Sequence, residues 1–209
     1  MPVYLQNQPD ENTHLVVWHI TESGDVLMSQ VNHLLHDHQT KTAKDNKHWL
    51  ASRLCLLHLF PGKKVVLAKD ENNKPHLEVE GIPFHISITH SFDMAAILVS
   101  ETQTVAIDME LIDKRIERVM YKFCNVDELT YLLPDQQLEQ LATIWSAKET
   151  LYKYYSRKEL DFRKNLFISA FQHQPEGYDL IGRVVTDQTA MQIKIHVAII
   201  YNYVLTLSY

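Results

Sequence analysis

The chain has 209 residues, of which 45% are hydrophobic and 22% charged, and its formal net charge is −6. With only 5 Gly and 7 Pro, this composition excludes a disordered or fibrous protein, and the acidic balance excludes nonspecific nucleic-acid binding, which needs a basic surface. The longest apolar run, "MAAILV", is too short to cross a bilayer, and the first residues lack the basic and apolar parts of a signal peptide. We therefore expect a globular cytoplasmic protein that binds neither nucleic acid nor membranes.

The first hundred residues contain strand patterns on either side of one helical pattern. Apolar residues in "THLVVWHI" predict a strand, and residues 31–60 have a helical pattern that Pro61 and Gly62 end. Runs rich in β-branched residues then predict strands over 64–68, 76–80, 84–91 and 94–100.

The second hundred residues open with "VAIDMEL" (105–111), which predicts a strand, and a helix over 115–123 follows. Asn125, with Glu128 three residues later, predicts a helix start of the capping-box type. The longest predicted helix begins near Asp135 and includes "LEQLATIWSAKETLYKYY". Further strands are predicted over 165–173, 178–185, 191–200 and 203–208. The fold class is therefore α+β.

The two halves share an order of elements and one short match. Trp49 and Ala51 of "WLASRLCLL" have counterparts at one common offset in Trp145 and Ala147 of "WSAKETLYK". Each of these helices is followed by strands that close on "ILVS" or "LTLS". A true repeat would mean two similar lobes joined near residues 100–104 with a cleft between them, and chance similarity is the alternative.

Asp108 and Glu110 lie two residues apart in the predicted strand 105–111, so both side chains point to one face of the sheet. Neighbouring carboxylates in a partly buried site repel each other until a proton, a basic group or a metal relieves the repulsion. A hard cation such as Mg²⁺ suits oxygen ligands of this kind. The two residues by themselves leave a solvated polar strand face and a metal site as alternatives.

Glu149 and Lys153 are four residues apart on the long helix, with Trp145 one turn earlier on the same side. One interpretation is an i,i+4 ion pair in the favourable order, which stabilises a helix by a few tenths of a kcal/mol. In the other interpretation Glu149 supplies a third carboxylate to a metal and Lys153 binds an anion beside it.

His90 lies where a strand runs into a turn, between the hydroxyls of Thr89 and Ser91. Such a group can bind phosphate, although an exposed strand-end histidine is the plainer interpretation. Lys74 and Pro75 of "NNKPH" indicate a turn.

Taken together and in chain order, four segments resemble the 4′-phosphopantetheinyl transferases, specifically their two-lobed surfactin-synthetase-type class. They are "NKP" (73–75), "FHISITHS" (84–91), "AIDME" (106–110) and "WSAKETLYK" (145–153), and "FCNVDEL" (123–129) resembles a further family segment. The family has Gly where this chain has Asn73 and Ala106. Two extra residues in the second segment place Thr89, rather than Ser87, before His90.

The resemblance implies a fold of two similar lobes, residues 1–103 and 104–209, that form a pseudo-dimer. Each lobe has a small antiparallel sheet packed with a long helix, and the ligand cleft lies between the lobes. It also implies a Mg²⁺ site made by Asp108, Glu110 and Glu149.

The same resemblance implies contacts with coenzyme A. The residues it indicates are Lys47, Arg53, Lys74, Pro75, Thr89, His90, Asp108, Lys148 and Lys153. Lys153 and His90 would contact phosphates, His90 the 3′-phosphate, while Lys74 and Pro75 would border the adenine. Lys148, with Lys47 or Arg53 from the early helix, would contribute to the anion site.

The implied activity is that of a holo-(acyl-carrier-protein) synthase type phosphopantetheinyl transferase. A Mg²⁺-dependent reaction moves 4′-phosphopantetheine from coenzyme A to a serine of an apo acyl or peptidyl carrier protein and releases 3′,5′-ADP. Asp108, Glu149 and Lys153 are the expected catalytic residues, with Glu149 as general base, either directly or through a water. The pathway served would be fatty-acid, polyketide or nonribosomal peptide biosynthesis, and the enzyme is expected to be a monomer.

Two other functions remain open at this point. One is a Mg²⁺-dependent phosphohydrolase that acts on a coenzyme A-like or nucleotide substrate with the same three carboxylates. The other is a non-catalytic relative that binds coenzyme A or a carrier. Because carrier proteins of this reaction are acidic and this chain is acidic too, docking is expected at a local basic segment, "DKRIER" (113–118).

Overall fold

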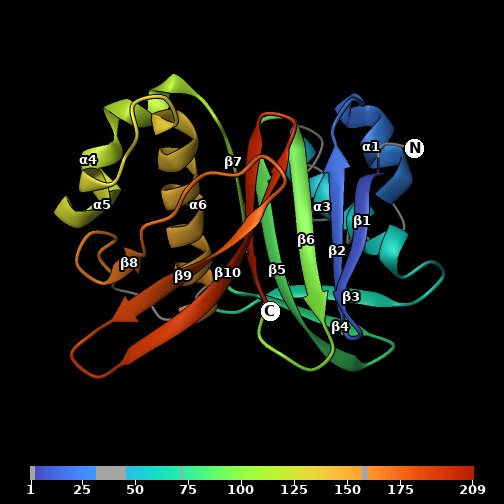
Figure 1. The fold of residues 1–209 in the computed structure, drawn as a ribbon. Coiled ribbons are helices and arrows are strands. Elements are labelled where there is room, and N and C mark those ends of the chain that lie inside the picture. The colour runs from blue at the N-terminus through green and yellow to red at the C-terminus, as the bar shows by residue number, and fades with distance from the viewer. Residues whose placement is uncertain (1–2, 32–45, 72, 157–159) are drawn as a thin grey trace. The chain divides into compact units, whose positions relative to one another are not determined.

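The computed structural model describes residues 3–31, 46–71, 73–156 and 160–209. The chain divides into two compact units, Met1–Val105 and Ala106–Tyr209. Each unit contains one antiparallel sheet and its own helices (Figure 1), so the α+β class expected from the sequence is confirmed.

The first unit is a six-stranded sheet with two described helices. In chain order its elements are β1 (Val3–Asp10), β2 (Thr13–His19), α1 (Gly24–Val31), α3 (Lys47–Leu59), β3 (Val65–Lys69), β4 (Pro75–Val79), β5 (Ile82–Ser91) and β6 (Met94–Ser100). The strand order across the sheet is β1-β2-β6-β5-β4-β3. Of the helix predicted over 31–60, residues 47–59 form α3, Val31 is the last residue of α1, and 32–45 lie outside the described residues.

The sequence-based prediction missed strand β1. Its segment "VYLQNQPD" is mostly polar and partly exposed, so it lacks the apolar alternation that identifies a half-buried strand. β1 is the edge strand beside β2, where a proline such as Pro9 is tolerated because one side of the strand needs no partner.

Helix α3 forms the core of the first unit together with the central strands. The Asn46 side chain accepts a hydrogen bond of 2.9 Å from the Trp49 N–H and so caps the first turn. The helix ends just before Pro61 and Gly62, as the sequence predicts. Its buried residues, among them Leu50 and Leu54, pack with alternate residues of β6 such as Ile97.

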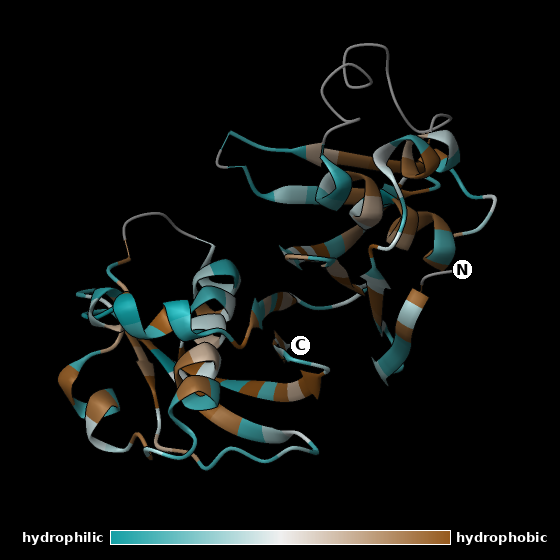
Figure 2. Ribbon diagram, turned by 90° about the horizontal axis from the view of Figure 1, so that it is seen from above, coloured by the Kyte–Doolittle hydropathy of each residue, from teal (hydrophilic) through white to brown (hydrophobic). Residues whose placement is uncertain are grey.

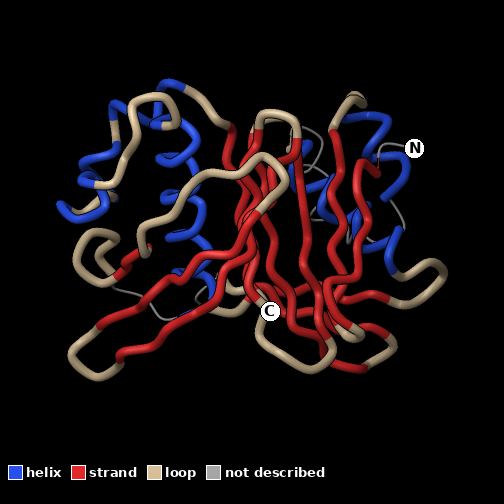
Figure 3. The backbone as a smooth tube through the Cα atoms, viewed as in Figure 1, coloured by secondary structure: helices blue, strands red, loops and turns tan. Residues whose placement is uncertain are grey.

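The second unit is a five-stranded sheet with one long helix. Its elements are β7 (Ala106–Leu111), the 3₁₀ helix η2 (Lys114–Arg118), α4 (Met120–Phe123), α5 (Val126–Thr130), α6 (Gln137–Tyr155), β8 (Leu166–Ile168), β9 (Tyr178–Val185), β10 (Ala190–Ile200) and β11 (Tyr203–Ser208). The strand order is β7-β11-β10-β9-β8. Helix α6 packs against all five strands of this sheet, and Figure 3 shows it as the long helix beside them.

The two sheets repeat one topology. Without β1, the first sheet reads β2-β6-β5-β4-β3, and this order corresponds strand by strand to β7-β11-β10-β9-β8. In each unit the longest described helix, α3 or α6, comes in chain order between the first strand of this set and the remaining four. Ala51 on α3 and Ala147 on α6 are fully buried against their own sheets, where a small side chain lets helix and strands approach closely. The two units are therefore similar in topology.

The turn that joins β3 and β4 is hydrophilic, and Figure 2 shows its described residues in teal. Among the described residues, no helix combines the length and the apolar character needed to cross a bilayer.

Candidate active site

Strand β7 directs its two acids toward helix α6. The ammonium of Lys153, on α6, donates hydrogen bonds to Asp108 Oδ1 at 2.8 Å and to the Ile107 carbonyl at 2.9 Å. Trp145, also on α6, hydrogen-bonds to the Glu110 carboxylate. Asp108 and Glu110 therefore share the helix-facing side of β7, as their spacing of two residues predicts.

The carboxylates of this cluster influence one another electrostatically. Burial, followed by the charges of Asp108 and Glu149, raises the pKa of Glu110 to about 7. Burial and the charge of Asp108 also raise the pKa of Glu149 to about 7, although Lys153 opposes the rise. The structure thus brings Asp108, Glu110, Glu149 and Lys153 into one electrostatically coupled group.

The donor set suits a hard divalent cation. All three acids offer carboxylate oxygens, the ligands that Mg²⁺ prefers, and their mutual repulsion is what a bound cation would relieve. Across the described ranges no three His, Cys, Asp or Glu side chains already stand at metal-ligand spacing. In this arrangement Asp108 is instead held by the Lys153 ammonium.

Aromatic side chains form one wall beside these acids. The Trp145 ring stacks on Phe162 with centroids 5.3 Å apart, and Tyr152 stacks on Phe162 at 5.6 Å. Phe123 packs at 5.1 Å against the same indole. The sequence-based prediction did not include Phe162, because it lies in a loop after α6 and no motif contains it.

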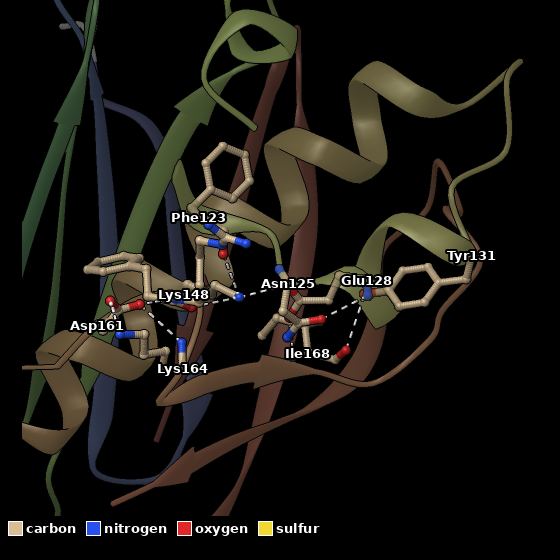
Figure 4. A network of polar contacts seen from close by, with 10 residues as sticks. Phe123, Asn125, Glu128, Tyr131, Lys148, Asp161, Lys164 and Ile168 are labelled. Atoms are coloured by element: carbon tan, nitrogen blue, oxygen red, sulfur yellow. Dashed lines mark hydrogen bonds and ion pairs between the residues drawn. The ribbon is translucent and has the colours of Figure 1, made fainter. Parts of the chain in front are cut away.

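Lys148 has a different role from the one expected (Figure 4). It is fully buried, and its ammonium donates to the Phe123 carbonyl, the Phe162 carbonyl and Glu128 Oε2 at 2.7–2.8 Å. An ammonium group has three N–H donors, so these contacts satisfy all of them. The prediction that Lys148 contributes to the anion site is therefore not supported, because a side chain without exposed surface cannot reach a ligand.

Glu128 connects this lysine to two other segments. One carboxylate oxygen accepts from the Asn125 N–H at 2.9 Å, and the other accepts from the Ile168 N–H at 2.8 Å (Figure 4). Asn125 in turn accepts from the Glu128 N–H, which completes the capping box predicted at the start of α5. Lys148 and Glu128 thus tie α6, α5 and β8 together.

The remaining predicted site residues lie in the first unit. His90, near the end of β5, is exposed, and its ring stacks on that of His48 with centroids 4.4 Å apart and planes 8° apart. Thr89, the residue before it, is buried, so its hydroxyl offers little surface to a ligand. The sequence-based prediction omitted His48, and only its ring contact with His90 in the folded chain identifies it.

The turn after His90 is fixed on both sides. Phe92 has φ 49°, a left-handed conformation that costs a residue other than glycine about 1–3 kcal/mol. His48 Nε2 contacts the Phe92 carbonyl at 2.5 Å, and His19 Nε2 contacts Asp93 Oδ2 at 3.1 Å. These contacts hold the hairpin tip that positions His90.

The early basic residues differ in their surroundings. Lys47, at the start of α3, is exposed and donates to the Glu22 carbonyl at 2.9 Å. Arg53 is partly buried, with its guanidinium 4.0 Å from the centroid of the Trp49 ring, and burial lowers its pKa to about 10. Of the two alternatives named from the sequence, Lys47 has the more accessible charge.

Lys74 and Pro75 lie at the start of β4, where Lys74 is exposed. Asn73, which stands where the resembling family has Gly, has φ 64°. Asn is one of the few residues that adopt this left-handed conformation at low cost, so the turn keeps its shape without a glycine.

The comparison with protein families identifies the second unit. Residues 104–207 match the model of the 4′-phosphopantetheinyl transferase superfamily, and this range includes Asp108, Glu110, Glu149 and Lys153. The chain belongs to this superfamily.

Individual relatives agree with this assignment. The chain is 32% identical over 113 residues to the 4′-phosphopantetheinyl transferase AcpT of Escherichia coli K12, which covers 51% of this chain and 56% of that protein. It is 31% identical over 111 residues to the protein of the same name from Salmonella typhimurium LT2, with 50% and 56% covered. The matched part therefore spans about half the length of each of these two relatives.

Proposed function

We propose that this phosphopantetheinyl transferase moves 4′-phosphopantetheine from coenzyme A to a serine of an apo acyl or peptidyl carrier protein. The observation that carries the proposal is the coupled group of three carboxylates and Lys153, which lies inside the residues that match the superfamily. Oxygen ligands beside a lysine suit the binding of a metal and a diphosphate together.

Asp108, Glu110 and Glu149 would hold Mg²⁺, which when bound supplies positive charge against the diphosphate of coenzyme A. Lys153 adds a second positive charge, because its ammonium is oriented toward Asp108 and is partly exposed. Trp145 orients Glu110 through its hydrogen bond. Phe162 stacks on Trp145 and is itself stacked by Tyr152, and these contacts keep the indole in place.

In the reaction, Glu149 accepts the proton of the carrier serine hydroxyl. A carboxylate within reach of the attacking hydroxyl is a suitable general base for this proton. The serine oxygen forms a bond to the β-phosphorus of coenzyme A, and the bond from that phosphorus to the bridging oxygen breaks. 3′,5′-ADP leaves with the electron pair of the broken bond, while Lys153 neutralises the charge that develops on the phosphate oxygens.

We assign the adenosine end of coenzyme A to the first unit. His90 would contact the 3′-phosphate, with Lys47 as the accessible early basic residue, and Lys74 and Pro75 would border the adenine. The repeated topology of the two units supports the two-lobed surfactin-synthetase-type class, with lobes 1–103 and 104–209. We further propose that the enzyme acts as a cytoplasmic monomer.

Carrier docking is proposed at the segment after β7. Lys114, Arg115 and Arg118 of η2 are exposed and basic. The following residues Val119 and Tyr121 expose 38% and 63% of their surfaces. A basic segment beside exposed apolar side chains suits the acidic, amphipathic surface expected of a carrier protein.

The decisive experiment incubates the protein with coenzyme A, Mg²⁺ and an apo carrier protein. Intact-mass analysis should show phosphopantetheine added to one serine of the carrier, with 3′,5′-ADP released in equal amount. A Glu149→Gln variant should lose this activity, and Lys164→Gln, which changes an exposed residue outside the group, should retain it. Cleavage of coenzyme A without modification of any carrier would contradict the proposal and favour a phosphohydrolase.

A further inference from the structure

Three hydroxyl groups join helix α6 to strand β11 inside the core of the second unit. Ser146 Oγ lies 2.8 Å from Thr206 Oγ1, and Thr150 Oγ1 lies 2.8 Å from the same atom. Thr150 also donates to the Thr206 carbonyl at 3.2 Å. All three residues are fully buried, so water does not compete for these hydrogen bonds. We call Ser146, Thr150 and Thr206 the hydroxyl cluster.

Each member of the cluster is next to a residue of the proposed site. Thr206 is paired directly with Asp108 in the antiparallel ladder of β11 and β7. Thr150 follows Glu149 along α6. Ser146 follows Trp145, whose side chain forms a hydrogen bond with the Glu110 carboxylate. The cluster therefore joins α6 to β11 at positions that adjoin Asp108 in the ladder and Glu149 and Trp145 along the helix.

Hydrogen bonds of this kind fix the orientation of the helix on the sheet, which apolar packing by itself does not. Much of the α6 interface consists of apolar side chains such as Leu151 and Ile195, whose attraction depends on buried area and not on orientation. Hydrogen bonds at fixed distances restrict both the slide and the rotation of the helix on the sheet. A metal site needs its ligands held to within about half an ångström, which apolar contacts by themselves do not ensure.

We propose that the hydroxyl cluster is a positioning device that sets α6 on β11 and β7, and thereby the separation between Asp108 and Glu110 on the strand and Glu149 on the helix. This role rests on the proposed function, because it concerns ligands of the proposed Mg²⁺ site. Ser146, Thr150 and Thr206 touch neither substrate nor metal and act through their neighbours.

The test measures Mn²⁺ binding to the full-length protein by the loss of the free-ion electron paramagnetic resonance signal, without coenzyme A or carrier. Thr206→Val keeps the side-chain shape and removes the hydroxyl, and we expect at least fivefold weaker binding. Thr206→Ser keeps the hydroxyl and should restore most of the affinity. Far-ultraviolet circular dichroism and thermal unfolding of each variant check that the protein is folded.

Thr143→Val is the matched control. Thr143 is also a fully buried threonine of α6, but its hydroxyl contacts the Glu139 carbonyl at 2.8 Å and the Tyr178 hydroxyl at 3.1 Å, away from the cluster. A purely structural role would make the two valine variants equal in stability loss and in Mn²⁺ affinity. The positioning role predicts weaker binding only for Thr206→Val.

The outcomes separate this inference from the proposed function. Wild-type protein that binds no Mn²⁺ would overturn both. Wild-type protein that binds Mn²⁺ while Thr206→Val binds it equally well would overturn the positioning role alone. Should Thr206→Val fail to fold, Ser146→Ala carries the same test, because it removes one hydroxyl of the cluster and leaves the strand unchanged.

Discussion

The ammonium of Lys153 lies 2.8 Å from Asp108 Oδ1, so a residue from α6 supplies the positive charge beside the first acid of β7. The two residues are 45 positions apart in sequence, and the pair forms because α6 packs across β7 and β11. A metal cation at Asp108 would have to share or replace this interaction. Lys153 and the cation are therefore expected to compete when no diphosphate is present to bind both.

Replacement of this lysine should strengthen cation binding in the absence of coenzyme A. In Lys153→Met the competing charge is gone, so the affinity for Mn²⁺ should rise at least threefold, measured by titration of the free-ion signal. Transfer activity should fall by two orders of magnitude or more, because the charge that neutralises the leaving phosphate is lost. Lys122→Met, which changes an exposed lysine of α4, should alter neither property. Weaker Mn²⁺ binding in Lys153→Met would refute the competition.

The stability of the metal-free protein should fall as pH rises from about 4.5 to about 7. Glu110 and Glu149 have folded-state pKa values raised to about 7 from an ordinary value of 4.5, so in this window the folded chain binds more protons than the unfolded chain. The free energy of unfolding then decreases with pH, because deprotonation favours the unfolded state. Urea unfolding at pH 5 and pH 7.5 in the presence of a chelator measures the effect.

Two comparisons make this pH prediction specific. Glu110→Gln should show a smaller loss of stability between the two pH values than the wild type, because one of the two raised carboxyl groups is gone. Added Mg²⁺ at pH 7.5 should restore stability to the wild type, since ligand binding to the folded state stabilises it. An identical pH dependence in wild type and variant would show that Glu110 does not titrate as described.

Loss of the Lys148 ammonium should destabilise the fold strongly. Lys148→Met leaves Glu128 buried without its partner, and removal of one member of a buried ion pair typically costs about 3–5 kcal/mol. Urea denaturation measures this directly. Lys164→Met is the control, because the Lys164 side chain is 82% exposed and its ion pair with Asp161 is long, at 3.9 Å. A Lys148→Met variant of wild-type stability but weaker coenzyme A binding would restore the role expected from the sequence.

Charge reversal on η2 should weaken carrier docking without affecting coenzyme A. In a variant with both Arg115→Glu and Arg118→Glu, we expect the KM for the carrier to rise about tenfold and the KM for coenzyme A to stay within twofold. Arg183→Glu, on an exposed position of β9, tests whether any loss of positive charge has the same effect. Equal KM values for the carrier in wild type and the η2 variant would exclude this segment as the docking surface.

The sequence by itself determined which residues can carry chemistry and which element holds each. Asp108 and Glu110 lie in a strand, and Glu149, Lys153 and Trp145 lie on one side of a helix, because strand and helix periodicities are local properties of the chain. The capping box at Asn125 and the end of α3 before Pro61 were predictable for the same reason. The polar edge strand β1 was missed, since pairing with β2 rather than its own apolar pattern makes it a strand.

Only the tertiary structure decided how the lysines of α6 are used. Lys148 and Lys153 both belong to the "WSAKETLYK" motif, and the motif does not say which one faces solvent. Lys148 is buried because α5 brings Glu128 to it, whereas Lys153 reaches Asp108 because β7 lies under that part of the helix. The stacking of His48 on His90 and the hydroxyl cluster at Thr206 likewise join residues distant in sequence. Such pairings depend on how elements pack, and no local pattern in the chain records them.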